Sequence, residues 1–211
     1  MMRTITLTLT GLLLLCALSL SAQIGIGVRA GATFSNQNID QDGLDVNLQN
    51  RTGYVIGIPL EIRLPGPIGL QIEANYTQFG SKLEQDLGPL GSFKAENVTN
   101  YLNFPVLAKV GKVGESFEAS ALAGLAFGYA LTAKSILDGE SEDVEFTDDD
   151  VRSNVGLVLG AQGGLPVGDG KVTLDARYNI GLNDLESEDD MVKATNRQFQ
   201  VAVGYMWTFG I

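Results

Sequence analysis

Apolar and polar residues alternate along eight stretches of this chain, and a period of two is typical of β-strands with two unlike faces. Between residues 24 and 34, isoleucine, valine, alanine and phenylalanine fill the even positions, and glycine, arginine and threonine fill the odd ones. Each stretch therefore predicts a strand with one apolar and one polar face. The eight stretches are residues 24–34, 52–64, 68–78, 98–110, 117–131, 151–165, 172–182 and 197–209.

The connections between these stretches alternate in length. The short connections lie around residues 65–67, 111–115 and 166–170, and the long polar ones span residues 35–51, 81–97, 134–150 and 183–196. Outer-membrane barrels combine short periplasmic turns with long extracellular loops, and a tilted strand needs about 9–11 residues to cross the hydrocarbon. We therefore predict an all-β fold, an eight-stranded antiparallel up-and-down transmembrane β-barrel with both termini on the periplasmic side.

The composition of the two faces predicts which one points outward. The polar face consists largely of glycine, serine, threonine, asparagine and glutamine, which suit the narrow interior of an eight-stranded barrel. Aromatic residues gather near both ends of the strands on the apolar face, as in the interfacial girdles of membrane barrels. These residues are Phe34, Tyr54, Tyr76, Tyr129, Phe117, Trp207 and Phe209. The alternative is a soluble barrel in which the same aromatics pack a core.

The N-terminus has the layout of a secretory signal peptide. Arg3 precedes an apolar run that ends before Ser21 and Ala22, and the run is too short for a membrane-spanning helix. We expect residues 1–22 to be the signal peptide and residues 23–211 to be the barrel domain. Cleavage would remove Cys16, the only cysteine, and would exclude disulfides and cysteine catalysis from the mature chain.

Two compositional features exclude further classes of function. The chain has no histidine, which is the commonest general base and a common zinc ligand, so we expect no enzyme, no catalytic residue, no cofactor and no metal site. The net charge of −11 argues against nucleic acid, because phosphates bind to basic surfaces.

Nine charged residues fall on the polar face and would point into the barrel. Buried charges must be paired to be tolerated, and five cations facing four anions favour a structural network over a ligand site or an ion path. Lys109 and Glu118 flank a short turn and form the pair most expected to meet. The nine residues are Arg29, Glu61, Arg63, Glu73, Lys109, Glu118, Arg152, Asp175 and Arg177.

Two long connections are strongly acidic. Carboxylates are typical calcium ligands, but the spacing lacks the order of an EF-hand loop, so we favour solvated extracellular loops that could meet a protein partner over calcium sites. One loop carries Asp138, Glu140, Glu142, Asp143, Glu145, Asp148, Asp149 and Asp150. The other carries Asp184, Glu186, Glu188, Asp189 and Asp190.

Three segments carry a family resemblance. YLNFPVLAK at residues 101–109, LDARYNIGL at 174–182 and the closing stretch at 196–205 resemble, in order and spacing, strands of the PorT-like outer-membrane β-barrel family of Bacteroidota. The resemblance covers the whole mature chain and implies an outer-membrane barrel. The namesake of the family is linked to a secretion and gliding system.

These observations favour a non-enzymatic integral protein of the bacterial outer membrane. We expect a monomer with a filled interior, surrounded by outer-membrane lipid, that acts as a structural or interaction platform through its acidic loops or as an envelope or secretion accessory. A small-solute pore or transport component is the first alternative, and a soluble periplasmic lipid-binding barrel is the second.

Overall fold

The computed structural model describes residues 23–41, 44–86, 88, 92–114, 116–147, 150–183 and 192–210. The predicted signal peptide and the acidic stretch at 184–190 lie outside these residues. No helix in the described part of the chain is long and apolar enough to cross a membrane. Its strands are β1 (Gln23–Gln41), β2 (Leu44–Asn47), β3 (Gln49–Arg63), β4 (Ile68–Asp86), β5 (Ser92–Val113), β6 (Glu118–Leu137), β7 (Glu140–Val144), β8 (Ser153–Val167), β9 (Gly170–Gly181) and β10 (Val192–Gly210).

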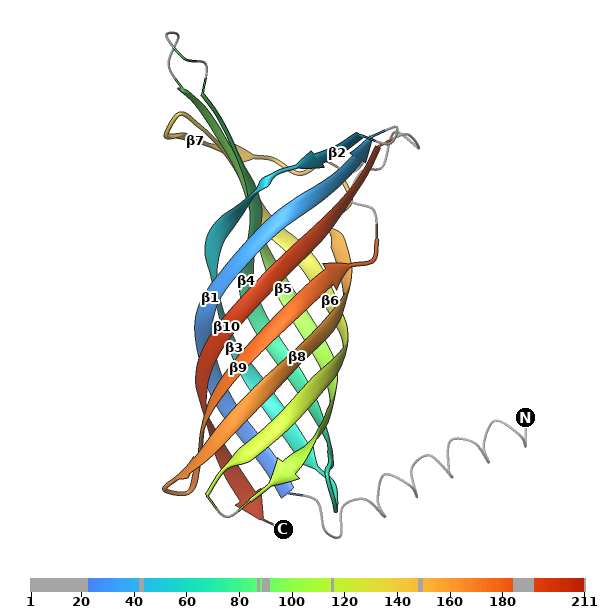
Figure 1. The fold of residues 1–211 in the computed structure, drawn as a ribbon, viewed down its shortest axis with the longest axis vertical. Coiled ribbons are helices and arrows are strands. Elements are labelled where there is room, and N and C mark those ends of the chain that lie inside the picture. The colour runs from blue at the N-terminus through green and yellow to red at the C-terminus, as the bar shows by residue number, and fades with distance from the viewer. Residues whose placement is uncertain are drawn as a thin grey trace, which may run out of the picture.

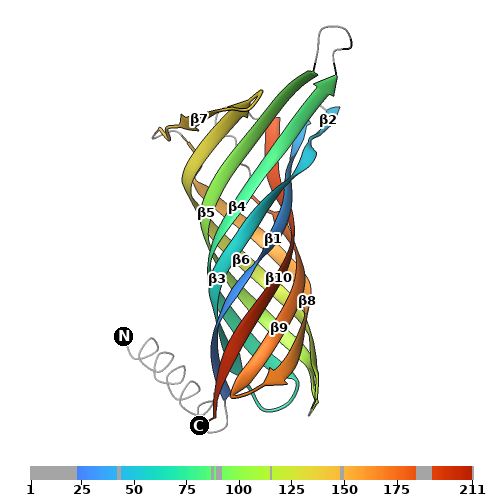
Figure 2. The ribbon, with the colours of Figure 1, turned by 90° about the vertical axis from the view of Figure 1, so that its left-hand side faces the viewer.

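Eight of these strands form a closed antiparallel ring. Each pairs with its neighbour in the order β1, β3, β4, β5, β6, β8, β9 and β10, and β10 pairs back with β1 from Gln23↔Gly210 to Gln41↔Val192. The tilted strands wind around a cylinder, with the C-terminus at the short-turn end (Figures 1 and 2). The predicted eight-stranded up-and-down barrel is confirmed, and β2 and β7 are short additions outside the ring.

The two faces of the ring have the orientation predicted from the alternation. Outward side chains are apolar and exposed, as at Leu174 (60%) and Val203 (55%), whereas the inward Gln71 and Gln198 are fully buried. Lipid stabilises an apolar exterior, and a polar interior must satisfy its own hydrogen bonds. The same sequence in water would expose a continuous apolar belt, so this arrangement fits a membrane.

A β-bulge at Leu131 of β6 shifts the pairing with the upper part of β5. The register between β5 and β6 shifts between Asn100 and Tyr101, and both of these side chains are buried. Tyr101 continues the inward odd-numbered face of Asn103 and Lys109, and its ring meets Phe79 edge-on at 5.3 Å between ring centroids.

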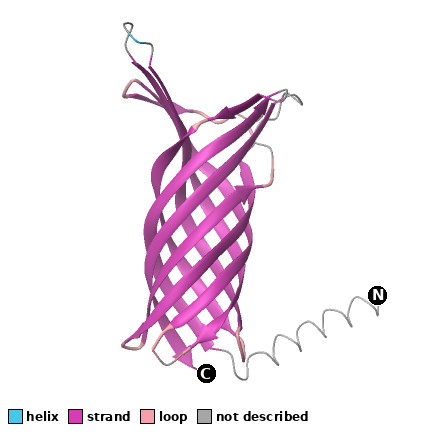
Figure 3. Cartoon of the chain, in the orientation of Figure 1, coloured by secondary structure: helices cyan, strands magenta, loops and turns pink. Residues whose placement is uncertain are grey.

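Several predicted loops are in fact strand extensions. Residues 81–97 mostly continue β4 and β5, which pair out to Asp86↔Ser92. β6 leaves β8 after Tyr129↔Ser153 and then pairs with β7. These extensions project beyond the ring at the long-loop end (Figures 1 and 3). Backbone pairing does not require an apolar face, so strands continue where both faces are wet and the alternation has ended.

Candidate functional site: the charged lumen

A balanced cluster of four charges lies deep in the lumen. Arg29 on β1 donates from Nη1 to Glu73 Oε2 on β4 at 3.0 Å and from Nη2 to Asp175 Oδ1 on β9 at 2.8 Å. Arg177, also on β9, donates from Nη1 to Glu73 Oε2 at 2.9 Å. All four side chains are at most 2% exposed. We call this set the central cluster.

The central cluster joins opposite walls of the barrel. β4 and β9 are four positions apart in the ring of eight, so the bond between Glu73 and Arg177 crosses the lumen. Gln71 and Asn75 donate to the two carboxylate oxygens of Glu73 at 2.6 and 2.8 Å. Charges buried this deeply are tolerated only when paired and hydrogen-bonded, and here the pairing also fills the cross-section.

A second cluster lies at the short-turn end of the lumen. Lys109 Nζ lies 2.6 Å from Glu61 Oε2 and 2.7 Å from Glu118 Oε1, and Lys171 Nζ lies 2.9 Å from a carboxylate oxygen of each. Arg63 Nη2 lies 2.8 Å from Glu61 and 2.6 Å from Glu118. We call Glu61, Arg63, Lys109, Glu118 and Lys171 the mouth cluster. It contains three cations and two carboxylates.

The structure brings eight of the nine predicted interior charges into these two clusters, four into each. It also places Lys109 beside Glu118, the pair expected from the short turn between them. Lys171 was missing from the prediction because the seventh stretch was begun at Val172. It occupies the same odd-numbered face as Asp175 and Arg177, so extending that alternation by one residue would have found it.

Arg152 does not lie in the lumen, and its predicted position is wrong. Strand β8 begins only at Ser153, so the alternation does not extend to Arg152. Its guanidinium carbon lies 4.6 Å from the ring centroids of both Tyr129 and Phe146, and its Nη2 donates to the carbonyl of Ala130 at 3.0 Å. Arg152 therefore fastens the segment after β7 to the outer rim of the barrel.

Part of the lumen is apolar, which the sequence analysis did not anticipate. Leu107, Leu122, Ala126 and Val158 point inward from β5, β6 and β8 and form a buried cluster. They occupy positions of the inner face that the polar residues leave free. The interior therefore contains packed aliphatic side chains as well as crossed ion pairs.

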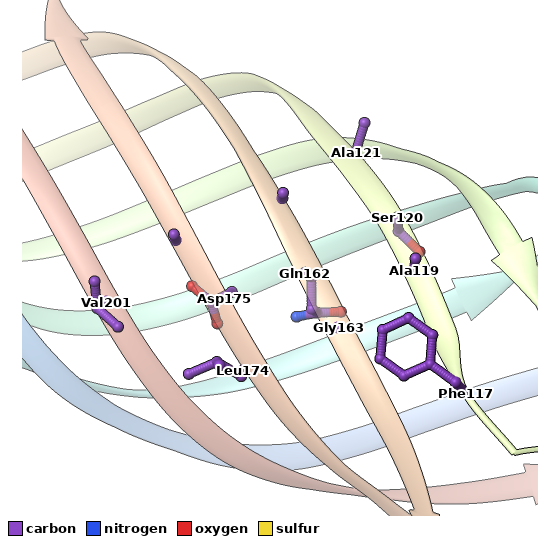
Figure 4. Close-up of a pocket in the computed structure, with 11 residues that line it drawn as sticks. Phe117, Ala119, Ser120, Ala121, Gln162, Gly163, Leu174, Asp175 and Val201 are labelled. Carbon is purple, nitrogen blue, oxygen red and sulfur yellow. The ribbon is translucent and has the colours of Figure 1, made fainter.

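A shallow hollow of about 580 Å³ lies in the outer wall of the barrel (Figure 4). Small outward residues on β6, β8 and β9 form its surface, among them Ala119, Ala121 and Gly163, and Phe117 stands at its edge. Gln162, behind it, is 5% exposed, so the hollow does not open into the lumen. This face is turned toward the membrane lipid.

No group of three or more histidine, cysteine, aspartate or glutamate residues is placed to hold a metal ion in the described part of the chain. The described acidic residues from Asp138 to Glu145 lie on β7 and beside it, where all five β7 side chains are exposed. The second acidic stretch lies outside the described residues, so the expectation for that loop stays a prediction.

Comparison with known proteins identifies the family of this chain. The family described as an outer membrane protein beta-barrel domain matches residues 19–187. The chain belongs to this outer membrane protein beta-barrel family. As the family implies, it is an integral protein of the bacterial outer membrane, and the soluble periplasmic alternative no longer applies. A search of curated proteins finds no match.

Solved structures similar to this family member are small outer-membrane proteins. Neisserial surface protein A is 17% identical, with 87% of this chain and 97% of that chain covered and a TM-score of 0.43. OprG from Pseudomonas aeruginosa is 12% identical, with 89% and 96% covered and a TM-score of 0.45. A major outer membrane protein from Thermus thermophilus is 14% identical, with 88% and 99% covered and a TM-score of 0.49.

Proposed function

We propose that this protein is a non-enzymatic outer-membrane platform with a closed lumen, and that it presents an acidic extracellular surface to a cationic partner. The observation that carries the proposal is the strand extension beyond the ring. We define the extracellular extension as residues 82–84, 93–97 and 133–147, on β4, β5, β6 and β7. It holds seven carboxylates and only three lysines.

The extracellular extension is ordered by its own strand pairing and exposes its charges to water. Its strands are paired, so its backbone needs no partner to be ordered. Lys82 and Lys94 both form ion pairs with Glu84, at 3.0 and 3.1 Å, and hydrogen bonds from the two lysines lower the pKa of this exposed carboxyl group. Most of its remaining carboxylates lie on the exposed β7 hairpin and face water.

Apolar side chains lie among these charges. Leu83, Phe93, Leu137 and Val144 are between 38% and 49% exposed, beyond the part of the ring that lipid covers. Apolar anchors surrounded by charge are typical of protein-binding surfaces. The supported partner is therefore a cationic protein or peptide with an apolar contact region.

Binding of an immobilised lysine-rich peptide to the purified protein in neutral detergent tests this function. Glu142→Lys on β7 should weaken binding about fivefold, since one unfavourable exposed contact costs about 1 kcal/mol. Asp169→Lys is the matched control, because it makes the same change in net charge at the turn between β8 and β9. Equal effects of the two variants would show that net charge alone matters and would contradict the proposal.

The finer family assignment is also part of the proposal. Residues 101–109 and 174–182 support a PorT-like barrel, and a role as an envelope or secretion accessory agrees with a surface that binds a partner. We also propose that the protein is a monomer without catalytic residues or cofactors. A small-solute pore is the competing function, and the crossed lumen argues against it.

A further inference from the structure

The mouth cluster carries a charge that its own residues do not balance. Among the described residues, the carboxylates that pair with Arg63, Lys109 and Lys171 are those of Glu61 and Glu118, and none of these five side chains is more than 20% exposed. The central cluster, by contrast, has two arginines and two carboxylates. None of the ion pairs formed by the three cations uses Asp169, the carboxylate of the nearby β8–β9 turn. An unbalanced charge in a poorly hydrated site is costly and favours a counter-ion.

A cavity adjoins the surplus charge. Its volume is about 140 Å³, and its walls include Arg63, Lys171 and Thr208, the acidic residue Glu118, and Gly114 and Gly170 beside the short turns. A water molecule in the liquid occupies about 30 Å³, so the cavity has room for one small anion with some of its hydration. It lies at the short-turn end of the lumen, which faces the periplasm in a barrel of this topology.

The donors in this cavity are suited to an oxyanion. Both bonds from Arg63 to Glu61 and Glu118 come from Nη2, which leaves Nε and Nη1 for a ligand. Lys171 adds a compact positive charge, and Thr208 adds a hydroxyl group. The three donors of Lys171 already bond Glu61 and Glu118, so Lys171 contributes charge, while Arg63 and Thr208 supply hydrogen bonds from two strands. Arginine binds phosphate oxygens by charge-assisted hydrogen bonds.

We propose that the mouth cluster binds an anionic phosphate group at the periplasmic end of the lumen. The group comes either from a phospholipid headgroup of the inner leaflet or from soluble phosphate. Bound there, it neutralises the third cation and closes the lower end of the barrel. This site is independent of the extracellular surface proposed above.

Thermal unfolding with inorganic phosphate as the probe tests the proposal. The protein is purified in neutral detergent and heated with sodium phosphate or with sodium chloride at equal ionic strength, and unfolding is followed by Trp207 fluorescence and by gel mobility. Phosphate should raise the midpoint of the wild type more than chloride does. Lys171→Gln leaves two cations for two carboxylates in the mouth cluster. It should reduce the phosphate-dependent rise in the unfolding midpoint at least tenfold.

Matched variants separate binding from a general loss of stability. Lys171→Arg keeps the charge and should retain the response, and Lys82→Gln removes an extracellular cation and should behave like the wild type. Glu118→Gln raises the surplus and should strengthen the response. If Lys171→Gln fails to fold, Thr208→Val, which keeps every charge, should still weaken phosphate binding.

Lipid nanodiscs distinguish the two sources of phosphate. One outcome is an unfolding midpoint that is higher in nanodiscs with added phosphatidylglycerol than in nanodiscs of pure phosphatidylcholine and yet does not change with soluble phosphate. That result assigns the site to a lipid headgroup. A response to soluble phosphate alone assigns it to the free anion. No response in either arm, or equal responses of wild type and Lys171→Gln, would overturn the proposal. A cluster neutralised by loss of a lysine proton would give that negative result.

Discussion

Glu73 on β4 and Arg177 on β9 face each other from opposite walls of the barrel and meet at 2.9 Å between Oε2 and Nη1. This one bond spans the lumen, and Arg29 shares the same carboxylate oxygen. The interior of an eight-stranded barrel is just wide enough for side chains, and here long charged side chains use that width. Ion pairs therefore connect opposite walls of the barrel at this level of the lumen.

The first prediction concerns conductance. Because the lumen is crossed at Glu73 and packed with aliphatic side chains nearby, the wild-type protein in planar bilayers should show no steady conductance steps. A Glu73→Ala variant that still folds should be the first to leak, since it removes the carboxylate that both arginines share. Reproducible, voltage-stable steps from the wild type would favour the pore function instead.

The second prediction concerns stability of the central cluster. Glu73→Gln leaves Arg29 and Arg177 facing a single remaining carboxylate, and an unpaired buried charge costs about 3–5 kcal/mol. Urea titrations of folding into lipid vesicles should show a loss of this size. Glu84→Gln should change stability far less, because exposed ion pairs are screened by water and contribute little. Similar losses in both variants would show that burial is not the cause.

The third prediction is a coupling in the mouth cluster. Glu118 contacts Lys109, Lys171 and Arg63 at once, so Glu118→Ala leaves a larger positive surplus. Adding Lys109→Ala removes one cation, and the double variant should be more stable than the sum of the two single losses predicts. A double-mutant cycle measured by urea unfolding gives the coupling. Strict additivity would mean that the two side chains do not interact.

The fourth prediction tests the outward face. Val203 is 55% exposed on β10, and an arginine near the middle of a bilayer costs about 2–4 kcal/mol. Val203→Arg should therefore impair folding into vesicles. Gly156→Arg should fail for a different reason, because even a Cβ atom at Gly156 would clash with the side-chain amide of Asn179. Normal folding of Val203→Arg would reverse the assignment of the faces.

The fifth prediction concerns the rim. Stacking of Arg152 on Tyr129 and Phe146 contributes about 0.5–1 kcal/mol for each ring, so Arg152→Ala should release the segment that follows β7. Protease added to intact cells should then cut between Val144 and Arg152 faster than in the wild type, while the ring strands stay protected. Cleavage that occurs only after cell lysis would place this rim on the periplasmic side.

The architecture could be predicted because a membrane barrel repeats one simple rule. Residues from Ile24 to Phe34 face the lipid and the lumen in turn. The polarity of each side chain follows the environment that it faces, so the direction can be predicted from the residue type. The extensions of β4 and β5 follow no such rule, since both their faces are wet, and their sequence was therefore assigned to loops. The bulge at Leu131, opposite Asn100 and Tyr101, likewise cannot be recognised from the alternation.

The sequence by itself determined the ring of eight strands, its outward face and the set of charges that the lumen must pair. Only the tertiary structure decided which charges meet, because strand tilt and register bring together Glu73 and Arg177, which are 104 positions apart in the sequence. It also decided that Lys171 joins the mouth cluster and that Arg152 leaves the lumen for the rim. Pairing inside a barrel depends on where distant strands align, and hydrophobic alternation along one strand carries no information about that alignment.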